Sequence, residues 1–268
     1  MTGGNAEAED LVTYRRSDGI VHLMLNRPEK LNALSAGLRV KLREALERFD
    51  DDREARVAII SGSGRAFCAG ADVQAKMLGE VDAGPRSPGE EPGGRSPRIH
   101  RTLLEMTNWK PVIAAVHGYA VGGGIVLALA CDIVIAAEGT SFQVTEISRG
   151  ISGNEIWSYI RRRTGEEFAN EVTLTGRRFS AGEAHARGMI SQVVPGDTLI
   201  EAANALAVQI AKNPPLAVQE AVRQRRMEFE AIEVEARRVL PRYLRFTEDY
   251  AESARAFSEK RPPKFVGR

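Results

Sequence analysis

Three consecutive glycines, Gly122 to Gly124, follow one apolar run of the chain and begin another. Glycine has no side chain, so a ligand can approach the backbone closely at such a point. If the second run is a helix, its first N–H groups lack partners within the helix and lie at the positive end of its dipole. The motif therefore predicts a site that stabilises developing negative charge. The alternative is a tight strand-to-helix crossing that needs glycine only for packing.

A second loop, Arg65 to Asp72, has a similar setting, because it follows the apolar run Val57 to Ile60 and precedes a predicted helix. It too could present a backbone N–H to a ligand. Two such donors, one from each loop, would hold a single oxygen atom. The pair is a stronger indication of an anion-stabilising site than either loop alone.

Both loops belong to a series of four motifs that occur in a fixed order along the chain. The four are Leu25-Asn26-Arg27-Pro28 with Asn32-Ala33-Leu34, Phe67-Cys68-Ala69-Gly70-Ala71-Asp72, Pro111 to Gly124, and Ala130-Cys131-Asp132-Ile133. A later pattern around Leu174-Thr175-Gly176-Arg177 and Gly188 continues the series. The series resembles the crotonase superfamily, that is, the enoyl-CoA hydratases and isomerases. The similarity runs from about Leu11 to Pro195.

The resemblance implies an α/β fold, with a crotonase-like ββα spiral core over residues 11–195 and a helical C-terminal region over residues 196–268. In this family the C-terminal region builds homotrimers, often paired as dimers of trimers. The implied substrate is an acyl-CoA thioester, with coenzyme A as part of the substrate and no further cofactor. The thioester oxygen would accept hydrogen bonds from the N–H groups of Ala71 and Gly123.

The resemblance also implies where the coenzyme A moiety lies. It would run along Arg27 to Leu31 and along the segment that contains Ala69, Asp72 and Val73. Arg27 and Lys30 are the candidates to face its phosphates, because anionic groups need positive partners. The alternative for both is an exposed, solvated charge.

The general acid–base group is where the chain departs from the family pattern. Family hydratases use two glutamates, and the position of the first is occupied here by Val126. The second is matched by Glu146, which is therefore the predicted general acid–base residue. Its apolar neighbours Phe142 and Ile147 would raise the pKa of a buried carboxyl, which suits proton transfer. The alternative is a glutamate in a structural ion pair.

The missing carboxylate leaves several reactions open. Adding water to a 2-enoyl thioester needs a positioned water and a proton donor, for which two carboxylates are well suited. Moving a double bond from the 3- to the 2-position needs one base that removes an α-proton and returns it at the γ-carbon. Retro-aldol cleavage, decarboxylation, and a protein that binds CoA esters with little catalysis are the remaining alternatives.

Two polar residues after Glu146 are candidates for an auxiliary role. Asn154 lies where dienoyl-CoA isomerases of the family carry a second acid, and Glu155 is the next residue. The alternative is that Asn154 caps a helix through Trp157 and Tyr159, with Glu155 complementing the helix dipole.

The elements that must position these residues alternate between strand and helix, which predicts an α/β fold. The expected elements are a hairpin of Leu11 to Arg15 and Ile20 to Asn26, a helix from the N-cap Ser35 to Asp50, a strand at Val57 to Ile60, a helix near Ile99 to Thr107, a strand at Val112 to Val116, a helix ending at Ala130, a strand at Ile133 to Ala136, a short helix between Ser180 and Gly188, and helices over Thr198 to Ala211, Leu216 to Glu230 and on to about Ser258. Residues 1–10 are expected to be frayed. Residues 79–97 hold four prolines and five glycines and are expected to form a mobile insertion, an inert loop or a lid.

Composition limits the possible partners. The chain carries 37 Lys and Arg against 36 Asp and Glu, so it lacks the basic excess of a nucleic-acid binder. The apolar run from Val112 to Ala137 contains His117 and Asp132, which disfavours a membrane span. Two cysteines cannot form a disulfide framework, so a reducing, cytoplasmic location is expected. The histidines have no acidic or cysteine partner at ligand spacing, so no metal site is expected.

Overall fold

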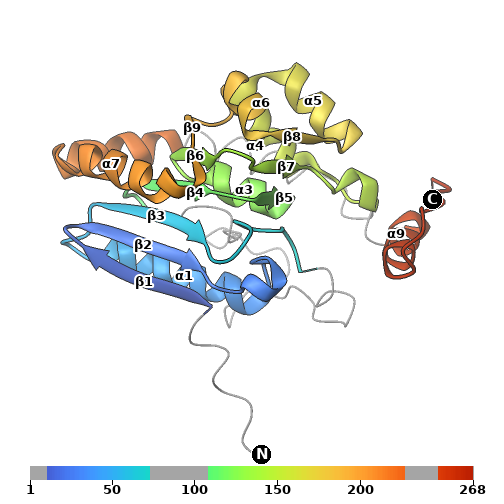
Figure 1. The fold of residues 1–268 in the computed structure, drawn as a ribbon, viewed down its shortest axis with the longest axis horizontal. Coiled ribbons are helices and arrows are strands. Elements are labelled where there is room, and N and C mark those ends of the chain that lie inside the picture. The colour runs from blue at the N-terminus through green and yellow to red at the C-terminus, as the bar shows by residue number, and fades with distance from the viewer. Residues whose placement is uncertain (1–10, 73–107, 227–246, 268) are drawn as a thin grey trace, which may run out of the picture.

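The computed structural model describes residues 11–72, 108–226 and 247–267 of the chain. The predicted N-terminal fraying, the insertion at residues 79–97, the helix near Ile99 to Thr107 and the candidate Val73 lie outside the described residues. The described part contains two sheets with helices on both sides of the larger one (Figure 1). The predicted α/β class is therefore confirmed.

The larger sheet has six strands in the order β1-β2-β3-β4-β6-β9. The strands β1 and β2 form an antiparallel hairpin, and every later pair in the sheet is parallel. Asp18 and Gly19 form the two-residue turn of the hairpin, both with positive φ, as the Asp-Gly pair predicts. The strands are β1 (Val12–Ser17), β2 (Ile20–Leu25), β3 (Val57–Gly62), β4 (Val112–Val116), β6 (Ile133–Ala137) and β9 (Gln192–Val194).

Alternate side chains of the large sheet enter two separate apolar layers. In β3, Val57 and Ile59 pack in one cluster while Ala58 and Ile60 pack in the other, which is the period of two that a strand imposes. The first cluster includes the inner face of α7 (Leu199–Ala211), and the second includes α1 (Ala36–Asp51) and α3 (Gly123–Ala130). Because both faces are covered, the central strands are almost continuously apolar.

Helix α1 has the start and the buried face that its sequence predicts. The Ser35 side chain accepts a hydrogen bond from the Leu38 N–H, which satisfies one of the unpaired donors at the helix start. The five buried positions recur at helical spacing and are Leu38, Leu42, Ala45, Leu46 and Phe49.

The smaller sheet has three strands in the order β5-β7-β8. They are β5 (Tyr119–Val121), β7 (Ser141–Gln143) and β8 (Arg178–Ser180). The sequence analysis predicts none of these strands, because three residues are too few to display a period of two. Further helices are α4 (Asn154–Thr164), α5 (Glu166–Thr175), α6 (Ala181–Ala186) and α9 (Glu248–Ser258), with short 3-10 turns η1 (Pro28–Lys30), η2 (Ile147–Arg149) and η3 (Gly196–Thr198).

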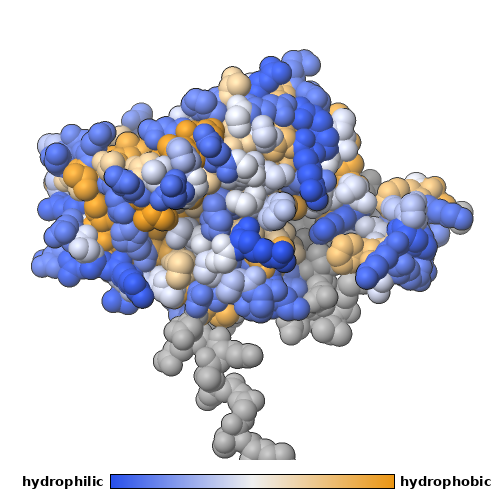
Figure 2. Space-filling view, viewed as in Figure 1, coloured by the Kyte–Doolittle hydropathy of each residue, from blue (hydrophilic) through white to orange (hydrophobic). Residues whose placement is uncertain are grey.

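Helix α7 has apolar side chains on two faces. Leu199, Ala203 and Ala207 are buried against the sheet, whereas Ile200 and Val208 are exposed. Apolar side chains are visible on the surface near this helix, at the left of Figure 2.

Among the described residues, no helix has the length and apolar character that crossing a membrane requires.

Asp132 joins the start of β6 to the helical residues 215–226. Its Oδ2 accepts hydrogen bonds from the Val112 N–H and from Arg226 Nη2, both at 2.7 Å, and Arg225 also donates to its carboxylate. Only 10% of the Asp132 side chain is exposed. One carboxylate therefore anchors the amino end of β4 and holds two arginines beside the sheet.

Removal of the Asp132 carboxylate is expected to leave two guanidinium groups without their main partner. Asp132→Ala should lower the free energy of unfolding by about 3 kcal/mol, since breaking a buried pair leaves an uncompensated charge. Glu44→Ala is the matched control, because Glu44 pairs with Lys41 on the exposed face of α1 and should cost less than about 1 kcal/mol. Urea unfolding measures both, and equal losses would contradict this role of Asp132.

Candidate active site

The predicted loop at Arg65 to Asp72 runs as an extended segment between two others and forms isolated bridges with them. On one side the N–H groups of Phe67 and Cys68 donate to the carbonyls of His117 and Tyr119, at 2.9 and 3.1 Å. On the other side the Ala69 N–H donates to the Leu31 carbonyl at 2.9 Å. The loop therefore lies directly beside β5, which ends at the glycine motif.

The amides of Ala71 and Gly123 belong to two segments in backbone contact. A Cβ placed on Gly123 would lie 3.9 Å from the Ala71 nitrogen. Gly123 is the first residue of α3, so its N–H has no partner within the helix. Across the described residues, neither amide takes part in a main-chain hydrogen bond of a loop or helix end. The structure therefore brings the two predicted donors into neighbouring positions.

Two glycines permit this approach. Gly70 has φ +85°, and a Cβ there would lie 2.5 Å from the Val121 carbonyl oxygen and 3.2 Å from the Gly123 nitrogen. Gly122 has φ +53°, and a Cβ there would lie 2.5 Å from Glu146 Oε1. Both values of φ lie in the region that favours glycine, and both Cβ positions are sterically blocked. Gly122, one of the glycines predicted to admit a ligand, leaves room for the Glu146 carboxyl group, and Gly70 lets its loop approach the glycine motif.

Glu146 is brought to the glycine motif by the pairing of β5 with β7. Val121 lies opposite Gln143 in this parallel pair, and the Gly122 N–H donates to the Gln143 carbonyl at 3.0 Å. Three residues after Gln143, the Glu146 carboxyl group lies beside Gly122. The structure therefore places the predicted acid next to the residue that precedes the Gly123 amide.

Burial raises the pKa of the Glu146 carboxyl, because an ion removed from water loses its hydration. Its own N–H and that of Thr145 oppose this rise, and the Thr145 N–H donates to Oε2 at 3.0 Å. The charge of Arg149 also lowers the pKa, whereas that of Glu155 raises it. The net direction is upward, which suits a group that both accepts and donates a proton.

The carboxyl end of α3 is held by a buried arginine. Arg163 Nη2 donates to the carbonyls of Leu129 and Cys131 at 2.8 and 2.7 Å. A cation at this end satisfies unpaired carbonyls and complements the helix dipole. The same dipole is positive at Gly123, so Arg163 stabilises the helix whose start forms half of the amide pair.

The predicted coenzyme A residues lie in three settings. The guanidinium of Arg27 donates to Asp72 Oδ2 at 2.5 Å, so these two candidates form an ion pair with one another. Lys30 is exposed in η1, and Ala69 is half-buried on the loop beside β5. The predicted contacts of Arg27 and Lys30 with phosphates remain predictions.

The auxiliary candidates require one correction. Gly153, rather than Asn154, is the N-cap of α4, and no side chain caps this helix. Asn154 is the exposed first residue of the helix, and its N–H donates to Ser152 Oγ at 3.3 Å. Glu155 lies in the first turn, where its charge complements the dipole as expected.

Val126 is buried in the apolar core, with 1% of its surface exposed. The helix position that holds a glutamate in family hydratases thus carries an apolar side chain here.

Cys68 is also buried, and burial raises the pKa of its thiol to about 12, so it remains protonated and a poor nucleophile. His117 Nε2 lies 2.9 Å from the Gly64 carbonyl oxygen.

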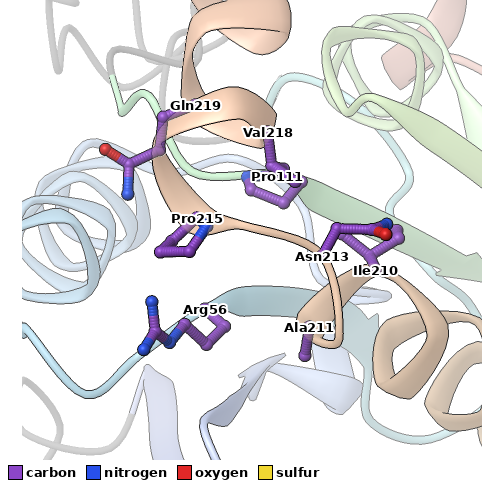
Figure 3. A pocket seen from close by; sticks show the side chains of 8 residues that line it. All are labelled: Arg56, Pro111, Ile210, Ala211, Asn213, Pro215, Val218 and Gln219. Atoms are coloured by element: carbon purple, nitrogen blue, oxygen red, sulfur yellow. The ribbon is translucent and has the colours of Figure 1, made fainter.

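A small surface hollow lies near the amino ends of β3 and β4 (Figure 3). The loops of the candidate site follow the other ends of these strands. Arg56 and Pro111 from these strand starts line it with Ile210, Asn213 and Val218. None of the predicted site residues lines it. The hollow is therefore separate from the candidate site at Ala71, Gly123 and Glu146.

Two residues of this region are missed by the sequence analysis. Asn32 has no assigned role there, although an asparagine in a loop is a signal of a turn with left-handed backbone. Arg149 is missed because its effect on Glu146 depends on the η2 turn that joins them.

Replacement of Glu146 by glutamine is expected to stabilise the fold at neutral pH. The folded-state pKa is raised above the unfolded value of about 4.3, so the folded state binds more protons between the two values. The free energy of unfolding must then fall as the pH rises through this window. Glutamine does not titrate, and Glu146→Gln therefore avoids the loss.

Thermal unfolding of both proteins measures this effect. The midpoint of Glu146→Gln should exceed that of wild type at about pH 7.5, and the difference should disappear below about pH 4. Glu138→Gln, at an exposed position, is the control and should show no such change. A midpoint for Glu146→Gln that is lower than wild type at both pH values would contradict the expectation.

Comparison with known proteins agrees with this geometry. A family model described as enoyl-CoA hydratase/isomerase matches residues 15–268. The (E)-benzylidenesuccinyl-CoA hydratase of Thauera aromatica is 35% identical, over 96% of this chain and 99% of that protein. The carnitinyl-CoA dehydratase of Proteus mirabilis is 37% identical, over 93% and 95%. The crystal structure of carnitinyl-CoA hydratase from Mycobacterium avium superimposes with a TM-score of 0.79 at 32% identity, over 96% of this chain and 99% of that one. The chain belongs to the enoyl-CoA hydratase/isomerase family, the crotonase superfamily that its motifs resemble.

Proposed function

We propose that this enzyme adds water to, or removes water from, an acyl-CoA thioester with Glu146 as its single general acid–base residue. The observation that carries the proposal is the contact of the Glu146 carboxyl with Gly122, next to the Gly123 amide. The names of the relatives support the reaction class, because they describe a hydratase and a dehydratase of CoA esters.

In the dehydration direction, the Glu146 carboxylate removes a proton from the carbon next to the thioester carbonyl. The electron pair moves onto the carbonyl oxygen, where the Ala71 and Gly123 N–H groups stabilise the enolate. One such donor is worth about 3 kcal/mol of barrier lowering. The enolate then collapses to the double bond as the β-hydroxyl leaves, and protonated Glu146 supplies the proton that completes the water molecule. Hydration is the reverse.

A double-bond shift is the second candidate, and the buried Val126 favours it. Without a second carboxylate, an attacking water lacks one hydrogen-bond partner. A shift from a 3-enoyl to a 2-enoyl thioester needs only Glu146, which moves one proton from the α- to the γ-carbon through a dienolate. Both reactions use the same amide pair, so substrate structure decides between them.

The apolar outer face of α7 supports a further part of the proposal. Ile200 and Val208 are exposed, unlike Leu199, Ala203 and Ala207 of the same helix. An oligomer, as a homotrimer or a dimer of trimers, would cover such a surface.

A substrate panel tests the chemistry. Wild type and Glu146→Gln are assayed with 2-enoyl-, 3-enoyl- and 3-hydroxyacyl-CoA thioesters of several chain lengths. Loss of the only proton-transfer group should lower kcat by about 10³-fold on whichever class reacts. Glu138→Gln is the matched control and should retain wild-type rates, since that carboxyl group is exposed.

Further variants and outcomes of the same assay separate the alternative reactions and roles. Gain of hydration by Val126→Glu, but not by Val126→Gln, would show that a missing carboxylate limits water addition. Unchanged rates for Glu155→Gln would exclude Glu155 as an auxiliary acid. Equal rates for wild type and Glu146→Gln would contradict the proposal, and tight binding of CoA esters without turnover would favour a binding protein.

A further inference from the structure

Asn32 is a polar residue with no exposed surface, placed between η1 and the start of α1. Its backbone is left-handed, with φ +54°, as is that of Leu31 with φ +51°. Asparagine adopts this conformation more readily than most residues, because its side chain can bond locally to the backbone. A fully buried amide must also have its hydrogen bonds satisfied.

The Asn32 side chain makes three hydrogen bonds, all to the main chain of two different loops. Its Oδ1 accepts from the Arg27 N–H at 2.8 Å. Its Nδ2 donates to the carbonyl of Ser63 at 2.9 Å and to that of Ala66 at 2.8 Å. One amide thus joins the loop that precedes α1 to the loop that follows β3.

Both of these loops lead directly to the Ala71 amide. The loop after β3 continues from Ala66 into the strand-like segment that ends at Ala71. The loop before α1 ends at Leu34, whose N–H donates to the Gly70 carbonyl at 2.7 Å and which forms a bridge with Ala71. Asn32 therefore holds these two loops at a fixed distance from one another. The Gly70–Ala71 peptide is bound to both loops, so its position depends on that distance.

We propose that Asn32 is a positioning residue of the reaction, which aims the Ala71 N–H at the thioester oxygen by holding the two loops in register. The inference rests on the proposed function, since it assigns the Ala71 amide to that oxygen. Asn32 does not touch the substrate. Its effect passes through the Gly70–Ala71 peptide, and a small rotation of that peptide would weaken the hydrogen bond to the enolate oxygen more than the binding of coenzyme A.

The variant Asn32→Asp tests this with the least change of shape. One carboxylate oxygen can still accept from the Arg27 N–H, but the other replaces a donor that faces two carbonyl oxygens. Asn32→Gly is the second variant, because it keeps the left-handed backbone and removes only the side chain. Asn108→Asp is the matched control, a buried asparagine whose Nδ2 donates to the Lys110 carbonyl near the start of β4.

Three quantities are measured for each protein: the unfolding midpoint, the kcat and KM for the reactive thioester, and the carbonyl stretching frequency of a bound saturated acyl-CoA labelled with carbon-13. Two well-aimed donors polarise the carbonyl and lower its frequency on binding. Asn32→Asp and Asn32→Gly should lose about 10²-fold in kcat, with a smaller change in KM and a reduced frequency shift. Asn108→Asp should lower the midpoint and leave the frequency shift as in wild type.

The outcomes separate the two claims. An unchanged frequency shift and kcat in folded Asn32 variants would overturn the positioning role, as would failure of both variants to fold, which would assign Asn32 to folding alone. Absence of turnover by wild type on every thioester would instead contradict the proposed function. The frequency comparison would still decide whether Asn32 aims the Ala71 amide.

Discussion

The candidate site depends on the main-chain hydrogen bonds that hold Phe67 to Ala71 as an extended segment between its neighbours. Donors of this segment are used on both sides, toward His117 and Tyr119 and toward Leu31, so the segment has little freedom to shift. The segment ends at Ala71, whose amide lies next to the first amide of α3. A carbonyl oxygen bound here would meet donors that are fixed before the reaction, which is the condition for stabilising developing charge without reorganisation.

The electrostatics of the site combine opposed requirements. The positive end of the α3 dipole and the two amides favour negative charge on the substrate oxygen. Glu146 lies beside Gly122, and burial raises the pKa of its carboxyl, which suits the proton transfer proposed for it. Its own N–H, the Thr145 N–H and the charge of Arg149 limit that rise.

The sequence suffices to predict elements whose signals are local. The turn at Asp18 and Gly19, the cap at Ser35 and the apolar strands of the large sheet all follow from neighbouring residues. The small sheet does not, because its strands are three residues long and pair over long distances. The contact of Glu146 with Gly122 depends on that pairing, as the Arg27–Asp72 ion pair depends on loops 45 residues apart. Family motifs indicate which of these residues matter, but only the fold shows what holds them.

The most direct measurement is a crystal structure of Glu146→Gln with a bound enoyl- or 3-hydroxyacyl-CoA. The account predicts that the thioester oxygen lies about 3 Å from both the Ala71 and the Gly123 nitrogen, with the reacting carbon facing residue 146. A thioester oxygen that contacts only one of these nitrogens, or neither, would contradict it.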